Sequence, residues 1–109
     1  MTTFKTAALL FIAAVTVGAG AASAETRFQE NHPRRAEVIG RAHHEIARIN
    51  EQRREGEISG FQARRLRAAD RHVINQEQRM AYRNGGYITR QQQVRLNREE
   101  NHIGRHIPG

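Results

Sequence analysis

The sequence of 109 residues contains no cysteine and no tryptophan, and it has only two prolines. The absence of cysteine excludes a disulfide framework, attachment of a lipid through an N-terminal cysteine, and a thiol nucleophile. Phenylalanine and tyrosine make up 6% of the chain, and their spacing forms no platform on which nucleic-acid bases could stack. Large apolar side chains are also scarce, so we expect a thin core, with marginal stability or homodimerisation as the consequence.

The first 24 residues have the pattern of a Sec-type secretory signal peptide. Lys5 supplies the positive charge, residues 7–17 form an apolar stretch, and Ala22-Ser23-Ala24 is a small-x-small cleavage site. We therefore expect cleavage before Glu25 and export to a bacterial periplasm. An uncleaved membrane anchor is the alternative, but the uncharged run over 6–24 is barely long enough and is rich in alanine and glycine rather than leucine.

After residue 24 the chain is strongly basic. It has 17 arginines, no lysine and 11 acids, which gives a net charge of +6 with neutral histidines. The use of arginine alone indicates either bidentate recognition of carboxylate and phosphate groups or the codon bias of a GC-rich genome. Such a charge is typical of nucleic-acid binding, but an exported chain rarely meets DNA, so we expect no nucleic-acid partner. Anionic membrane surfaces and acidic envelope proteins are the partners that suit it.

Helical periodicity predicts an all-α protein, with a flexible arm over 25–32 and a single domain of three helices over 33–109. Pro33 favours the start of the first helix, and Gly56 ends it. Ser59 and Thr89 each stand three residues before a glutamine, the pattern of a capping box that begins the second and third helices. The third helix is expected to run until Pro108.

The turn and the start of the second helix recur at an offset of 30 residues. Of the 18 pairs from Gly56/Gly86 to Val73/Ile103, six are identical and three are conservative, which indicates a supersecondary unit used twice. The fold is then two overlapping helix-turn-helix repeats. The repeated motif consists of Gly56, Ile58, Ser59, Gln62 and Leu66, and of Gly86, Ile88, Thr89, Gln92 and Leu96. The predicted core consists of Ile39, Ile46, Ile49, Ile58, Leu66, Val73, Met80, Ile88, Leu96 and Ile103.

The repeated turn also has the spacing of the second half of a calcium-binding EF-hand loop. Arg53 and Arg83 stand at the third loop position, where a carboxylate should bind the ion, and glutamine replaces the glutamate at the twelfth position of both loops. The two turns are therefore not expected to bind calcium.

Two resemblances follow from these motifs. The strings Ile58-Ser59-Gly60-Phe61-Gln62 and Ile88-Thr89-Arg90-Gln91-Gln92 resemble the LTxxQ signature of the Spy and CpxP periplasmic stress proteins. That resemblance implies a helical, usually dimeric cradle that holds unfolded clients or senses envelope stress. Residues 32–38, 83–89 and 96–101 resemble a group of small exported proteobacterial proteins with no assigned activity. This second resemblance implies export and a shared fold, and it implies no function.

Six histidines after residue 24 raise the possibility of a metal site. His102 and His106 lie four residues apart on the predicted third helix, and Glu99 lies one turn earlier on the same side. These three residues are the candidate ligands for zinc or copper. Exposed histidines without any metal are the simpler interpretation of the same spacing.

The sequence gives no support to catalysis. It has no serine elbow and no glycine-rich phosphate loop, and Asp70-His72 and Glu100-His102 are expected to be solvated charges. We expect a non-enzymatic periplasmic binding protein without a cofactor, which acts as a chaperone-like or stress-response factor for unfolded envelope proteins. A histidine-based metal-binding or metal-sensing protein is the alternative.

Overall fold

The computed structural model describes residues 24–108, and all the regular secondary structure in this range is helical. The predicted all-α class is therefore confirmed. The predicted signal peptide over 1–24 lies outside the described residues except for Ala24. The flexible arm was expected over 25–32; residues 24–31 are helical and belong to a separate structural unit, and His32 begins the next one. None of the described helices is both long enough and apolar enough to cross a membrane.

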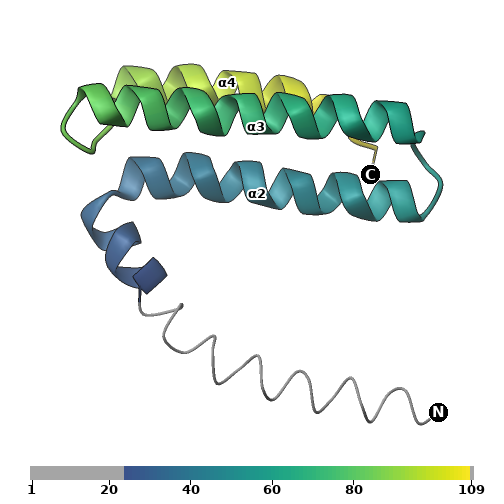
Figure 1. Cartoon of the computed structure of the whole chain (residues 1–109), viewed down its shortest axis with the longest axis horizontal. Coiled ribbons are helices and arrows are strands. Elements are labelled where there is room, and N and C mark those ends of the chain that lie inside the picture. The colour runs from purple at the N-terminus through teal and green to yellow at the C-terminus, as the bar shows by residue number, and fades with distance from the viewer. Residues whose placement is uncertain (1–23, 109) are drawn as a thin grey trace, which may run out of the picture. The chain divides into compact units, whose positions relative to one another are not determined.

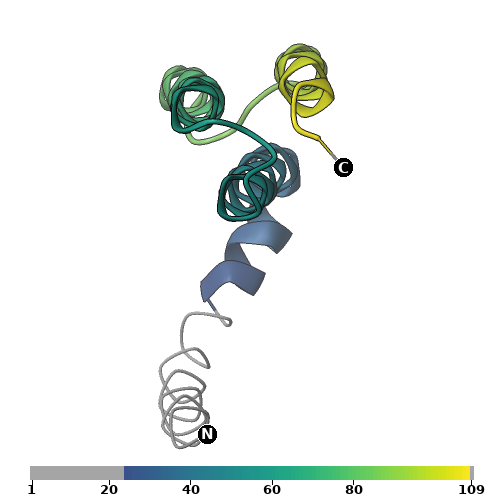
Figure 2. The same ribbon diagram turned by 90° about the vertical axis from the view of Figure 1, so that its right-hand side faces the viewer.

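Three helices make up the unit that begins at His32. Helix α2 spans Pro33–Arg54, α3 spans Gly60–Arg83 and α4 spans Arg90–Arg105. Figure 1 shows α2 and α3 running side by side, with α4 beside them. The end-on view in Figure 2 shows the three helices at the corners of a triangle, and each packs against both of the others.

The starts of α3 and α4 are fixed by two matching capping boxes. In α3 the Ser59 hydroxyl accepts a hydrogen bond of 3.1 Å from the Gln62 amide, and the Gln62 side chain accepts one of 2.8 Å from the Ser59 amide. Thr89 and Gln92 make the same two bonds, at the same lengths, in α4. The predicted caps are thus confirmed, and each satisfies two amides that the helix leaves without a partner.

The two turns need glycine at particular positions. Gly56 after α2 has φ of 76°, and Gly86 after α3 has φ of 99°, in the left-handed region that other residues rarely adopt. Each glycine is followed two positions later by a buried isoleucine, Ile58 or Ile88. The turns therefore return the chain to the core as well as reversing its direction.

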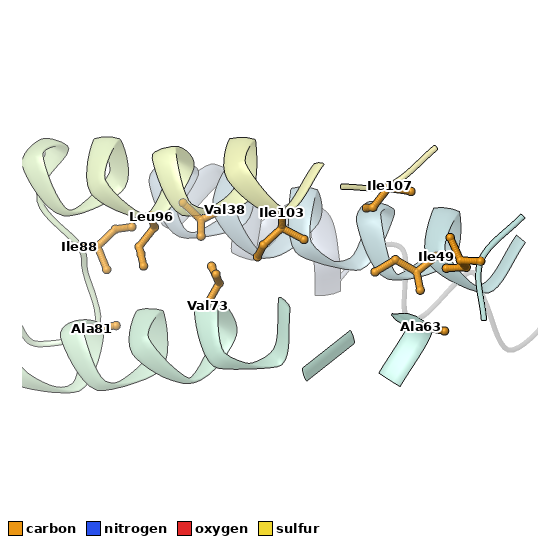
Figure 3. Close-up of a cluster of buried hydrophobic side chains, with 10 residues drawn as sticks. Val38, Ile49, Ala63, Val73, Ala81, Ile88, Leu96, Ile103 and Ile107 are labelled. Carbon is orange, nitrogen blue, oxygen red and sulfur yellow. The ribbon is translucent and has the colours of Figure 1, made fainter. Parts of the chain in front are cut away.

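The core is a narrow line of short aliphatic side chains between the three helices (Figure 3). Figure 3 shows Val38 and Val73 directed toward one another, with Ile88 and Leu96 toward one end of the cluster and Ile49, Ala63 and Ile107 toward the other. Of the predicted core residues, six are buried: Ile49, Ile58, Val73, Ile88, Leu96 and Ile103. Leu66 and Met80 are partly buried and pack against this cluster.

The predicted core of α2 was wrong in its rotation. Ile39 and Ile46 are only half-buried, whereas Val38 and Ala42 are fully buried. The buried residues of α2 alternate at spacings of four, three and four, which is the seven-residue pattern of helices packed nearly parallel. This rotation places Glu45, rather than Ile46, on the side that faces α3 and α4.

Candidate functional site: a buried carboxylate cluster and an apolar groove

Three carboxylates lie together in the core, one from each helix. Glu45 of α2 is 5% exposed, and Asp70 of α3 and Glu100 of α4 are 0% exposed. One oxygen from each can be chosen so that all three lie within 4.8 Å of one another. We call these three residues the carboxylate cluster. In the part of the chain that the structure describes, no other three histidines or acids come together in this way.

The oxygens of the cluster are largely without hydrogen-bond donors. Both oxygens of Asp70, both of Glu100 and Oε1 of Glu45 are buried and have no hydrogen-bond partner among the described residues. Three ionised carboxylates cannot share such a space without compensation, because burial and mutual repulsion both act against the charges. Protons or a cation must therefore reduce the charge of the cluster.

The pKa values of the cluster are displaced accordingly. Burial raises the pKa of Asp70 to about 8, and the nearby carboxyl groups of Glu45 and Glu100 add to the effect. Burial also raises the pKa of Glu100 to about 8, and the nearby Arg41 guanidinium only partly offsets it.

A fourth buried acid differs from the cluster because it is paired. Glu77 of α3 is fully buried and accepts two hydrogen bonds from Arg35 of α2, at 2.5 Å from Nε and 3.1 Å from Nη2. This bidentate geometry satisfies both carboxylate oxygens. Glu77 therefore has a structural explanation that Asp70 and Glu100 lack.

The expectation that Asp70 and Glu100 are solvated was wrong. Asp70 lies four residues after Leu66 and three before Val73, and Glu100 lies in the same way between Leu96 and Ile103. Both acids thus occupy the apolar stripe of their helices, where the seven-residue spacing directs side chains inward. That spacing is the signal by which the sequence could have identified them.

The predicted metal ligands lie elsewhere on α4. The exposed rings of His102 and His106 have centroids 4.9 Å apart, and Nδ1 of His106 lies 2.9 Å from the His102 carbonyl oxygen. Glu99 is directed toward α3, where Oε2 accepts a hydrogen bond of 3.1 Å from Gln76. The structure brings the two histidines together but does not gather Glu99 with them into a cluster of three potential ligands.

The other histidines are scattered. His43, His44 and His72 are exposed, and half-buried His32 makes a ring contact with Tyr87 at 4.7 Å between centroids. None of these four belongs to a group of three potential metal ligands within residues 24–108.

A groove between α3 and α4 combines apolar and basic side chains. Phe61 stands at one side with 58% of its surface exposed, and the Arg65 guanidinium lies 5.7 Å from the centre of its ring. The same groove is lined by Leu66, Ala69, Ile103, His102 and His106. We call this surface the Phe61 groove. Phe61 is one of three exposed aromatic side chains, with Tyr82 and Tyr87, and it adjoins the apolar side chains of Leu66 and Ala69 in this groove.

Comparisons with protein-family models, curated proteins and solved structures find no match to this chain.

Proposed function

We propose that this chain is a non-enzymatic binding protein of the bacterial periplasm that holds unfolded, acidic polypeptides in the Phe61 groove. The observation that carries the proposal is the exposed Phe61 ring beside Arg65, in a groove that the apolar side chains of Leu66 and Ala69 also line. An apolar anchor beside a fixed cation favours segments that combine apolar and acidic residues. The resemblance to the LTxxQ stress proteins supports the same class of function.

The charge of the exported chain supports an acidic client. Further arginines flank exposed side chains on the outer faces of the bundle: Arg90, Arg95 and Arg98 surround Val94, and Arg79 and Arg83 stand beside Tyr82. A surface of this kind attracts anionic chains at long range, and the attraction weakens as the salt concentration rises. Binding through the groove should therefore be fastest at low ionic strength.

The architecture that we propose for this function is two overlapping helix-turn-helix repeats after a signal peptide cleaved before Glu25. The matching caps at Ser59 and Thr89 support the repeat, because the same atoms make the same bonds in both. The groove would then be formed where the two repeats meet. A homodimer would extend it into a longer surface.

The test is suppression of aggregation by the mature chain, 25–109. We expect that a near-stoichiometric amount reduces light scattering from an acidic client such as reduced α-lactalbumin, and that it has little effect on a basic client such as reduced lysozyme. Phe61→Ser should weaken the suppression several-fold. Tyr82→Ser removes an even more exposed ring, 90% accessible, from outside the groove and serves as the matched control. Absence of suppression at about tenfold excess would reject the proposal.

A vesicle experiment separates this function from binding to a membrane surface. If the basic faces recognise lipid, the chain should sediment with anionic vesicles and Phe61→Ser should not change its effect on the client. If the groove recognises polypeptide, anionic vesicles should not displace the client from the chain at physiological salt. At that ionic strength, screening weakens the attraction between the basic faces and the vesicle surface.

A second candidate function is the binding of zinc or copper by His102 and His106. The observation that favours it is the proximity of the two rings, with 4.9 Å between their centroids. Calorimetry with zinc should show binding at micromolar concentrations that is lost in His102→Ala/His106→Ala and kept in His43→Ala/His44→Ala. Absence of heat in this range would end the idea.

A further inference from the structure

We propose that Glu45, Asp70 and Glu100 form a buried site for a hard divalent cation, such as Ca²⁺ or Mn²⁺, that joins the three helices. The site is separate from the Phe61 groove and from the two histidines of α4, and it does not depend on the function proposed above. It lies inside the bundle, where each helix supplies one ligand.

The geometry of the carboxylate cluster is compatible with such an ion. Three oxygens that lie within 4.8 Å of one another share a point no more than about 2.8 Å from each. Calcium–oxygen distances in proteins are about 2.3–2.6 Å, so a shift of the carboxylate oxygens by a few tenths of an ångström completes the coordination. Three carboxylates can supply six oxygens, which is enough for an ion of this class without further protein ligands.

The buried oxygens without partners are a second observation that indicates a ligand. Asp70 is fully buried and neither of its oxygens accepts a hydrogen bond from any described residue, and the same is true of Glu100. Glu77 shows that this chain can satisfy a buried acid with arginine when it needs only a structural pair. The cluster lacks such a partner, although arginine is the most abundant charged residue of the chain.

The residues around the carboxylate cluster leave space for the Glu45 carboxylate and carry charges that suit a bound cation. A Cβ atom at Gly104 would lie 3.0 Å from Oε2 of Glu45, so the missing side chain gives this carboxylate its space. The charges that act on the cluster from its surroundings are Arg41, Glu37 and Glu99. Three carboxylates and one divalent ion would leave a single negative charge, which Arg41 partly offsets.

The ligand atoms decide the class of ion. Carboxylate oxygens are hard donors, and they suit calcium, manganese and magnesium, whereas copper and zinc prefer nitrogen or sulfur ligands. Calcium and manganese are favoured over magnesium, because magnesium retains several waters and demands shorter distances of about 2.0–2.1 Å. Any zinc or copper bound by this chain should therefore be held by the histidines instead.

The experiment uses the mature protein after treatment with a chelator. Mn²⁺ is added at about pH 7.5 and the free ion is measured by electron paramagnetic resonance, while Ca²⁺ is followed by calorimetry and by thermal unfolding. We expect one ion per chain and, at saturation, a rise in the unfolding temperature of about 10 °C or more. Asp70→Asn and Glu100→Gln should each lower the affinity at least about tenfold.

Control variants distinguish the core from the surface. Glu57→Gln removes an exposed acid in the turn before α3 and should leave the affinity unchanged. Circular dichroism of Asp70→Asn and Glu100→Gln tests whether each variant is folded, and the affinity is read from a variant that keeps the helical signal of the wild type. The proposal is overturned if no ion binds at millimolar concentrations, which would mean that protons alone neutralise the cluster. It is equally overturned if binding survives both substitutions and is lost in His102→Ala/His106→Ala.

Discussion

The stability of the cation-free protein should fall as the pH rises from about 4 to about 8. Asp70 and Glu100 have folded-state pKa values of about 8, raised from ordinary values of 3.8 and 4.5. Between those limits the folded state binds more protons than the unfolded state. Each raised pKa therefore contributes stability that is complete below about pH 4 and is lost as the pH rises through about 8.

The expected magnitude follows from the size of these pKa shifts. One pKa unit corresponds to about 1.4 kcal/mol. A single carboxyl group that stays protonated in the folded state therefore lowers the free energy of unfolding by about 4 kcal/mol as the pH rises from about 5 to about 8. A domain of this size has a total free energy of unfolding of about 4–12 kcal/mol. Even one such group would therefore leave the protein much less stable at mildly alkaline pH than at mildly acidic pH.

The assay is urea unfolding followed by far-UV circular dichroism, in the presence of a chelator. A change of about 4 kcal/mol corresponds to a shift of the midpoint by about 2 M urea. The double variant Asp70→Asn/Glu100→Gln should flatten the profile, and it also controls for the histidines that titrate over the same range. A wild-type profile that falls by less than about 1 kcal/mol, or that rises with pH, would refute the assignment of buried, protonated carboxyl groups.

Three further predictions concern the core and the helices. Leu96→Asp should abolish the helical circular dichroism signal, because Leu96 is fully buried. Leu66→Asp should reduce that signal less, because Leu66 is only half-buried. Equal losses of signal would contradict the packing of these two residues. Glu77→Gln should lower the free energy of unfolding by about 3 kcal/mol because it disrupts the pair with Arg35, and replacing both residues with methionine should restore most of that loss, with urea titration as the measurement. Gly40 lies inside α2, and apart from its chain neighbours and the backbone of its own helix no atom would lie within 4 Å of an added methyl group, so Gly40→Ala should raise the unfolding temperature by about 4–8 °C. A decrease measured by thermal unfolding would show that the site is packed.

The sequence predicts those parts of the fold that depend on neighbouring residues. Pro33, the two capping boxes and the glycines of the turns act within a few residues, so the helix starts and the ends of α2 and α3 follow from them directly. The end of α4 was predicted less well, because the helix stops at Arg105 rather than at Pro108. The rotation of α2 could not be predicted in the same way. Val38 and Ile39 are adjacent aliphatic residues, and only the positions of α3 and α4 decide which of them is buried.

The carboxylate cluster was beyond the reach of single-helix reasoning. The spacing of Asp70 and Glu100 from the apolar residues of their own helices indicates that each faces inward, but it does not show that the two acids and Glu45 lie close together. Only the juxtaposition of three helices shows that the acids meet. The histidines of α4 gave a clearer local pattern, since two ligands four residues apart share a face of one helix.

Burial of Asp70 and Glu100 also changes the net charge with which the folded chain binds to an ion exchanger or an anionic surface. The formal charge of +6 after residue 24 counts Asp70 and Glu100 as ionised, but at neutral pH both retain protons when no cation is bound. The folded chain then carries a charge nearer to +8 and should be retained more strongly on a cation exchanger than its unfolded form, whose carboxyl groups all ionise. Folding thus makes this chain more cationic, and its electrophoretic mobility becomes a direct measure of the state of its core.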